Sequence, residues 1–360
     1  MSLIAVKVNL CRLIKTFILK KQIYKKIGQE NGEHPVGDAP DSMSGRKEQI
    51  DMYTKLSTAG MSREAWLKLR KTGIGGSDAG AICGLNPYSS PMKVYQDKTC
   101  PESEELDNES IRQGHDLEEY VAQRFMEATG LKVRRSNYMY RSIEYPFMIA
   151  DVDRLVVGED AGLECKTANA YNTDKWKDGN IPLHYFMQCY HYMAVTGKHT
   201  WYIAAVILGQ KFLYHKLKWD DALIREMIGA EQYFWDNHVQ KGIMPDPDGS
   251  ESCDAVLNHY FRKAEKFDIL KLSDFDEKLH RREEIIGAID RLKKEQSQIE
   301  QEVKWHMKDH EKAVSEAFRI SWSNVESTRL DTERIKKERP EIYQDYAKVS
   351  SSRRFRIKAA

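Results

Sequence analysis

The stretches MIADVDR (residues 148–154) and GLECKT (residues 162–167) decide how this chain of 360 residues folds. Each places acidic side chains at or within a short apolar run that is typical of a β-strand. Because alternate side chains of a strand share a face, Glu164 and Lys166 are predicted to point one way, and Leu163 and Cys165 the other. If the two strands adjoin, an aspartate of the first stretch lies beside Glu164.

Two carboxylates at this range form a hard-oxygen site that suits Mg²⁺ or Mn²⁺. Such a metal polarises a phosphate and activates a water molecule. Lys166 can orient that water or stabilise developing negative charge. Asp151 and Asp153 are both candidates for the second carboxylate, since they stand two residues apart on one strand face. On spacing alone, however, a surface ion pair between Glu164 and Lys166 is the better explanation.

A carboxylate on the predicted helix at residues 109–129 favours a site over a surface pair. At 100° per residue, Glu118 falls inside the apolar stripe formed by Leu117, Val121, Phe125 and Ala128. A charge within such a stripe needs a compensating partner, which a metal would supply. The alternative is a glutamate at the edge of the stripe that reaches water.

Two further features point the same way. Gln188 lies in an aromatic helix, where a buried amide bonds a neighbouring group; that group could be the lysine, the phosphate or simply the core. Arg70 precedes the glycine-rich turn GIGGSD (residues 73–78), in which Ser77 opens a helix. Such a turn is a natural anion site. An ordinary capped loop would, however, have the same residue pattern.

The remaining pattern predicts one large α/β (α+β) domain at residues 51–262, with a central mixed sheet flanked by helices. Ser62 is expected to cap a first helix. Glycines are expected to end two later helices at Gly130 and Gly197. Further predicted strands span residues 147–150, 155–157, 201–208 and 212–219, and helices span residues 183–195 and 221–240.

The flanking segments differ in composition. Residues 1–47 comprise a basic stretch with seven Lys or Arg and no acid in residues 1–26, followed by a linker rich in Gly, Pro, Asp and Ser. Residues 272–315 carry apolar side chains at spacings of three, four and seven, which predicts an amphipathic helix or coiled coil. The tail at residues 316–360 ends in RRFRIK (residues 353–358), a predicted basic strand or basic patch.

Composition excludes some classes of protein. Lys and Arg number 56 against 55 Asp and Glu, so nucleic-acid binding would need local patches rather than net charge. The six cysteines form no CxxC pair, which argues against a zinc knuckle or redox motif and fits a reducing cytoplasm. No apolar run approaches the ~18–20 residues of a membrane span, so we expect no membrane partner.

Taken together, the motifs resemble the YqaJ-type viral recombinase family, relatives of phage lambda exonuclease in the PD-(D/E)XK nuclease superfamily. The resemblance covers residues 60–220 and extends to motifs in the tail, but not to residues 1–45. It is carried by motifs in order and at matching spacing: GIGGSD (73–78), GLNPYSSP (84–91), Gly114-x-x-x-Glu118, ADVDR (150–154), ECKT (164–167), and Ile181-Pro182 with Tyr185 and Gln188.

The resemblance implies a PD-(D/E)XK restriction-endonuclease-like core and a role for each matched residue. Glu118, Asp153 and Glu164 would be metal ligands, with the Cys165 carbonyl as a further ligand. Asp153 is preferred to Asp151 because its Asp-Arg pair stands where the family has Asp-Gly. Lys166 would be the catalytic lysine and Gln188 a support for the site, while Arg70 and Ser77 would hold a DNA 5′-phosphate.

The activity implied is that of a Mg²⁺- or Mn²⁺-dependent, two-metal DNA exonuclease acting 5′→3′ on double-stranded ends in a prophage recombination system. A RecT-type single-strand annealing protein would be its partner, and the chain would form a closed homo-oligomer such as a ring trimer. Two alternatives are a structure-specific or restriction-like endonuclease, and a non-catalytic DNA-binding assembly protein with a decayed nuclease core.

Overall fold

The structure is a computed structural model that describes residues 52–101, 109–264, 269–349 and 353–358. The predicted basic extension and linker at residues 1–47 lie outside the described residues. The chain divides into two compact units, the first ending at Phe261 and the second beginning at Arg262. Each unit is described by itself. None of the described helices is long and apolar enough to cross a membrane.

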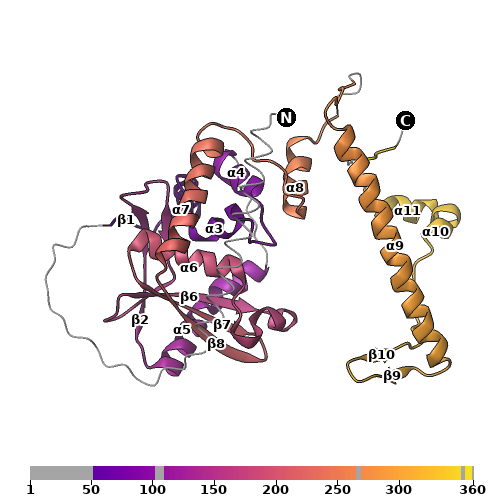
Figure 1. The fold of residues 1–360 in the computed structure, drawn as a ribbon, viewed down its shortest axis with the longest axis horizontal. Helices are drawn as coiled ribbons and strands as arrows, with labels where there is room; N and C mark the ends of the chain where they lie inside the picture. Colours follow the sequence, from indigo (N-terminus) through magenta and orange to yellow (C-terminus); the bar gives the residue numbers. More distant parts are fainter. Residues whose placement is uncertain (1–51, 102–108, 265–268, 350–352, 359–360) are drawn as a thin grey trace. The chain divides into compact units, whose positions relative to one another are not determined.

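A five-stranded mixed sheet lies at the centre of the larger unit, in the order β2-β5-β6-β7-β8 (Figure 1). The central pair β6–β7 is parallel, and the other pairings are antiparallel. The predicted α/β architecture with a central mixed sheet is therefore confirmed. The strands are β2 (Val133–Arg135), β5 (Arg154–Val156), β6 (Ala161–Ala168), β7 (Thr200–Ile207) and β8 (Lys211–Lys218).

A second, antiparallel sheet has the order β1-β3-β4, formed by β1 (Tyr53–Ser57), β3 (Tyr138–Ser142) and β4 (Ile149–Asp151). Asp151 therefore ends a strand of the small sheet, whereas Asp153 directly precedes β5 of the central sheet. The expectation that both aspartates share one strand face is wrong, because the chain passes from one sheet to the other between them.

Helices cover both faces of the central sheet. On one face, α6 (Leu183–Thr196), α3 (Gly76–Ile82) and α7 (Asp221–Phe234) enclose the main apolar core. On the other face, α5 (Glu109–Thr129) packs its Val121 and Phe125 against Leu163 and Cys165 of β6. The other helices of this unit are α2 (Arg63–Lys71), α4 (Pro91–Thr99), the 3₁₀ helix η1 (Ala170–Gly179), the π-helical turn η2 (Trp235–Val239) and α8 (Glu251–Tyr260).

Glycine allows α3 to approach α6 closely. A Cβ at Gly76 would stand 2.5 Å from the ring of Tyr192, and one at Gly80 would stand 2.8 Å from His184 Cα. Real Cβ atoms do not approach other atoms so closely, so the contact between these two helices depends on the missing side chains.

Local signals at the helix ends agree with the sequence in most places. Ser62 caps α2 by accepting from the Ala65 amide, as predicted. Gly130 and Gly197 follow α5 and α6 with φ of 72° and 68°, the left-handed conformation that ends helices. By contrast, α3 has Gly75 rather than a side chain at its N-cap position, so Ser77 does not cap it.

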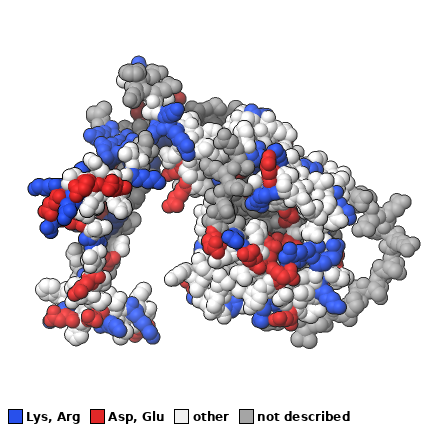
Figure 2. All heavy atoms as spheres, turned by 180° about the vertical axis from the view of Figure 1, so that it is seen from behind, with Lys and Arg blue, Asp and Glu red and all other residues white. Residues whose placement is uncertain are grey.

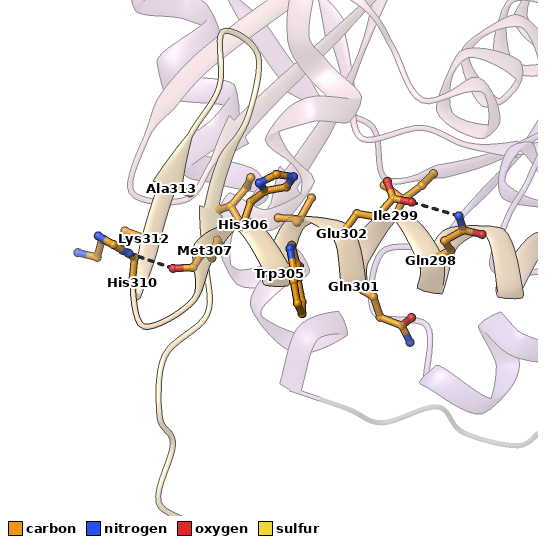
Figure 3. Close-up of a pocket in the computed structure, with 12 residues that line it drawn as sticks. Gln298, Ile299, Gln301, Glu302, Trp305, His306, Met307, His310, Lys312 and Ala313 are labelled. Atoms are coloured by element: carbon orange, nitrogen blue, oxygen red, sulfur yellow. Dashed lines mark hydrogen bonds between the residues drawn. The ribbon is translucent and has the colours of Figure 1, made fainter.

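The smaller unit is built on α9 (Asp276–Met307), a helix of 32 residues. The helix predicted over residues 272–315 thus ends earlier, because Lys308 adopts a φ of 47° and the chain turns into a hairpin of β9 (Lys312–Val314) and β10 (Arg319–Ser321). A hollow of about 850 Å³ lies between the end of α9 and this hairpin, and Figure 3 shows side chains that line it. Two short helices follow, α10 (Thr332–Glu338) and α11 (Pro340–Tyr346).

The tail of the smaller unit differs from expectation. Of the two forms predicted for residues 353–358, a basic strand or a basic patch, the structure shows no strand there, and the basic patch stays a prediction. No strand pairs with this segment among the described residues of this unit. Alternation of basic and apolar side chains does not by itself produce a strand, because a strand needs a partner with which to pair.

Candidate active site

Glu164 and Lys166 project from the middle of β6, which lies between β5 and β7. Glu164 is only 1% exposed, and its Oε1 lies 2.5 Å from Lys166 Nζ, so the two side chains share a face. Asp153 adjoins the same strand, because its Oδ2 accepts a hydrogen bond of 2.8 Å from the Cys165 amide. The structure therefore brings Asp153, Glu164 and Lys166 together.

Asp151 lies in a different environment. Its Oδ2 accepts a hydrogen bond of 2.7 Å from the indole Nε1 of Trp66 on α2. The Arg70 guanidinium carbon lies 5.4 Å from the centre of the same indole ring. Asp151 is thus held by the small sheet and α2, which leaves Asp153 as the aspartate beside Glu164.

Glu118 stands at the start of the buried face of α5. Its side chain is 25% exposed, and it contacts His115 Nδ1 at 3.2 Å and Arg154 Nη1 at 3.7 Å. Burial raises the pKa of both Asp153 and Glu164, and the charge of Glu118 acts in the same direction. Glu118 is linked to Asp153 through Arg154, which contacts both residues. The expected apolar stripe differs at its far end, where Ala128 is exposed.

Arg154 is a member of this cluster that sequence reasoning did not assign. Its buried guanidinium donates 2.8 Å to the Asp153 carbonyl and 3.2 Å to Glu119 Oε2. The available signal was its position directly after Asp153, where the resembled family has glycine. Arg154 supplies a cation that pairs with two acids on α5, Glu118 and Glu119.

The electrostatics of the cluster favour an added positive charge. Burial, followed by the Asp153 carboxylate, raises the pKa of Glu164 to about 8. Burial acts to lower the pKa of Lys166, but Glu164 and Asp153 together raise it well above its usual value, so the ammonium stays protonated. Glu164 Oε2 is buried without a hydrogen-bond partner among the described residues. A buried, unpaired carboxylate oxygen is costly unless a proton or a cation satisfies it.

The cluster is not a closed metal cage as it stands. Among the described residues, no three His, Cys, Asp or Glu side chains converge closely enough to hold an ion. Asp153 and Glu164 adjoin, while Glu118 turns toward His115 and Arg154. The donor set fits a hard divalent cation in chemistry, and a third carboxylate reaches it only if Glu118 leaves Arg154.

Gln188 is buried on α6, and its Nε2 donates 2.9 Å to the hydroxyl of Tyr192. Burial, and then the charge of Glu164, raises the pKa of Tyr192, which therefore stays neutral. Lys166 lies instead over the ring of Tyr185, with Nζ 4.7 Å from the ring centre. Of the partners that the sequence left open for Gln188, the structure shows a core group, the hydroxyl of a tyrosine one turn further along α6, and not the lysine.

Arg70 and Ser77 also meet, with Arg70 Nη2 donating 2.9 Å to Ser77 Oγ. Sequence reasoning did not find the two groups that anchor this contact. Asp78 accepts from the Gly75 amide at 2.8 Å and pairs with Lys98 at 2.7 Å and with Arg70 at 3.5 Å. Burial acts to raise the pKa of Asp78, but Lys98 and Arg70 lower it to about 2.

Charged side chains of both signs lie side by side over the face shown in Figure 2, in keeping with the net charge of +1. Any attraction for a polyanion therefore comes from local groups such as Arg70 and Lys166, rather than from a uniform positive surface.

Comparison with known proteins assigns this chain to a family. A family model described as "YqaJ-like viral recombinase domain" matches residues 65–199. The protein "Uncharacterized protein YqaJ" of Bacillus subtilis (strain 168) is 38% identical over 303 residues, which cover 83% of this chain and 95% of that protein. This chain belongs to the YqaJ family. The family match spans α3, α5, β6 and α6, the elements that carry the clusters described above.

Two solved structures resemble the fold of this YqaJ-family member. An alkaline exonuclease (LHK-Exo) from Laribacter hongkongensis is 20% identical, with a TM-score of 0.44, covering 50% of this chain and 94% of that one. A phage related exonuclease from Haemophilus somnus 129PT is 14% identical, with a TM-score of 0.37, covering 49% of this chain and 99% of that one.

Proposed function

We propose that this chain is a divalent-metal-dependent DNA nuclease, specifically an exonuclease that degrades double-stranded ends in the 5′→3′ direction during phage-type recombination. The observation that carries the proposal is the buried, unpartnered Oε2 of Glu164 next to Asp153 and Lys166. Membership of a family described by a viral recombinase domain supports the link to recombination, and the two similar solved structures are an alkaline exonuclease and a phage related exonuclease.

Asp153 and Glu164 would hold Mg²⁺ or Mn²⁺, joined by the Cys165 carbonyl and by Glu118 once it turns from Arg154. When bound, the metal supplies charge that polarises the phosphate and favours ionisation of a water molecule. Lys166, protonated because two carboxylates raise its pKa, would stabilise negative charge at the reacting phosphate. Gln188 would support the site by fixing the Tyr192 hydroxyl.

Arg70 and Ser77 would bind the terminal 5′-phosphate. The guanidinium is held against Ser77 and Asp78, so its orientation is set before DNA arrives. The Gly75 amide is already bonded to Asp78, which removes one of the backbone donors expected from the glycine-rich turn. The phosphate contact would therefore rest on the two side chains.

Digestion of linear duplex DNA in Mg²⁺ tests the catalytic assignment. Lys166→Ala should lower the rate by roughly 10²–10³-fold, the loss typical of removing one donor that stabilises a transition state. Lys211→Ala, on the exposed edge of β8, is the matched lysine control and should leave the rate unchanged. Full activity in Lys166→Ala would contradict the proposal. Equal cutting of closed circles would replace the exonuclease with an endonuclease.

Linear duplexes with a 5′-phosphate or a 5′-hydroxyl test the phosphate site. Arg70→Ala should reduce the preference for phosphorylated ends while sparing the rate on hydroxyl ends, because only the phosphate contact is lost. An unchanged preference would remove Arg70 from this role.

The proposed function extends to assembly. By family resemblance, the chain would form a closed homo-oligomer, as in a ring trimer around DNA, and would act with a RecT-type single-strand annealing protein. Light scattering of the full chain should then give a mass that is a small multiple of 41.8 kDa. A strictly monomeric mass at working concentration would contradict the closed ring.

A further inference from the structure

A small hollow of about 220 Å³ opens next to the candidate active site, where the ends of β6 and β7 meet η1 and the start of α6. Tyr185 links the hollow to the candidate active site. Its ring lines the hollow, and Lys166 Nζ lies over the same ring, 4.7 Å from its centre. A group seated in the hollow is therefore one aromatic ring away from the lysine of the proposed reaction.

A row of aromatic rings leads from Tyr185 out to solvent, each ring tilted or perpendicular to the next. His184 and Tyr185 have ring centres 4.0 Å apart, and the next ring, Tyr88, stands edge-on to His184 at 5.8 Å. Tyr88 is 63% exposed although it belongs to this ring cluster. Behind them, Trp176 is buried and stacks on Tyr185, so it fixes the back of the hollow rather than lining its mouth.

The polar groups of the hollow suit a neutral or anionic ligand. Its lining residues, all within the described part of the chain, include no Asp or Glu. Lys175 donates 2.6 Å to the Tyr88 hydroxyl and supplies the positive charge at the mouth. Burial, and then Lys166 and Lys175, lower the pKa of His184 to about 4, so its ring is uncharged at neutral pH. The amides of Asn169 and Asn172 add donors and acceptors.

The size of the hollow limits what can enter. Its volume is below that of pockets that enclose a whole drug-sized ligand, which is about 300–1,000 Å³. A second hollow of about 500 Å³ adjoins it and shares Lys175, Pro182 and His184. One flat ring fits the first hollow. The second hollow, where the Asp174 carboxylate is paired with Lys177, leaves room for the chain to which that ring is attached.

We propose that the hollow beside Tyr185 binds one unpaired nucleobase of a DNA strand, which stacks on the exposed ring of Tyr88 with the perpendicular ring of His184 at its side. The proposal rests on the proposed nuclease function, since it assigns the base to the strand that enters the active site. Stacking on aromatic rings accepts every base, and Lys175 pairs with the adjacent phosphate. The site thus binds single-stranded DNA without sequence preference.

Binding of abasic DNA tests this site without any need for cleavage. The full chain is titrated, in EDTA, into duplexes with a labelled single-stranded overhang in which each nucleotide in turn lacks its base, and anisotropy gives the Kd. At one position, loss of the base should weaken binding by roughly 5- to 140-fold, the range for one stacked base. Tyr88→Ala should weaken binding of intact DNA to the same extent.

The two changes must also be coupled. In Tyr88→Ala, removing the base at that one position should cause no further loss, whereas Tyr88→Trp should keep the wild-type pattern. Tyr171→Ala is the matched control, since Tyr171 is 95% exposed on η1 but lines neither hollow, and it should bind as wild type. The base site would be overturned if removing the base weakened binding by the same factor in Tyr88→Ala as in the wild type. It would also be overturned if the wild type bound every abasic duplex as tightly as intact DNA.

Cleavage of the same duplexes in Mg²⁺ separates this proposal from the proposed function. Coupled binding losses with no cleavage at all would retain the base site and refute the nuclease. Cleavage that depends on Lys166, together with no coupling at Tyr88, would retain the nuclease and refute the base site.

Discussion

Replacing Asp78 with asparagine should destabilise the larger unit by an amount that depends on pH. The Asp78 carboxylate has a pKa of about 2 in the folded protein, against a usual value of 3.8. At 1.36 kcal/mol for each pH unit, this difference corresponds to about 2 kcal/mol of stability at neutral pH. Because the folded pKa is the lower one, this contribution is present above pH 3.8 and is lost as the pH falls toward 2.

The loss of stability at pH 7 should exceed this value, because Asp78→Asn also leaves the buried Lys98 ammonium without its ion-pair partner. The Lys98 side chain is 3% exposed, and burial already lowers its pKa. A buried pair that loses one partner typically costs about 3–5 kcal/mol. Adding Lys98→Met to Asp78→Asn removes the stranded charge and should recover part of that loss.

Urea unfolding followed by tryptophan fluorescence gives the free energies that check this prediction. The difference between wild type and Asp78→Asn should be at least about 2 kcal/mol at pH 7 and should shrink by about 1 kcal/mol between pH 5 and pH 3. A difference below about 1 kcal/mol at pH 7, or a double variant no more stable than Asp78→Asn, would refute the reasoning.

Three other perturbations have defined outcomes. Gly162→Ala should lower the melting temperature and cost at least about 1–3 kcal/mol, because its Cβ would stand 2.3 Å from the Trp201 indole. Glu231→Gln should destabilise the protein more at pH 6 than at pH 9. Burial acts to lower the pKa of His191, but the charge of Glu231 raises it overall, above its usual value of 6.5. The stability from this pair is therefore complete below pH 6.5 and is lost as the pH rises through the pKa of His191 in the folded protein. Mn²⁺ should raise the melting temperature of the wild type but not of Glu164→Gln, which lacks the carboxylate.

Each of these outcomes has its own control. Gly229→Ala, where an added Cβ meets nothing within 4 Å, should be neutral or slightly stabilising in the middle of α7. For the buried pair, equal losses at pH 6 and pH 9 would contradict the assignment. The melting temperature of each protein without metal serves as its own reference, because Glu164→Gln also removes the ion-pair partner of Lys166. An Mn²⁺-induced shift in Glu164→Gln equal to that of the wild type would contradict ligation by Glu164.

The parts of the site that follow from local pattern could be predicted. Strand alternation alone placed Glu164 and Lys166 on one face of β6. Glycine at the ends of α5 and α6 marked where those helices stop. The start of α4 was equally readable, since Ser90 caps it and Pro91 occupies its first turn, although that helix was not predicted.

The parts that depend on distant segments could not be predicted. His191 and Glu231 are 40 positions apart, yet they form a fully buried pair. Arg154 reaches Glu119 across 35 positions. Periodicity describes one element at a time, so it cannot reveal which charge on another element neutralises a buried acid. The same limit explains why Asp151 and Asp153 could not be separated until their sheets were known.

The close approach of α3 and α6 has a consequence for movement. The helix that carries Ser77 and Asp78 is seated on the helix that carries Gln188 and Tyr192, with glycine in place of the side chains that would separate them. The proposed anchor for a DNA end and the proposed reacting centre therefore lie on two helices whose backbones pack directly against each other. If that spacing stays fixed during the proposed reaction, each cycle advances by moving the DNA rather than by moving one helix against the other.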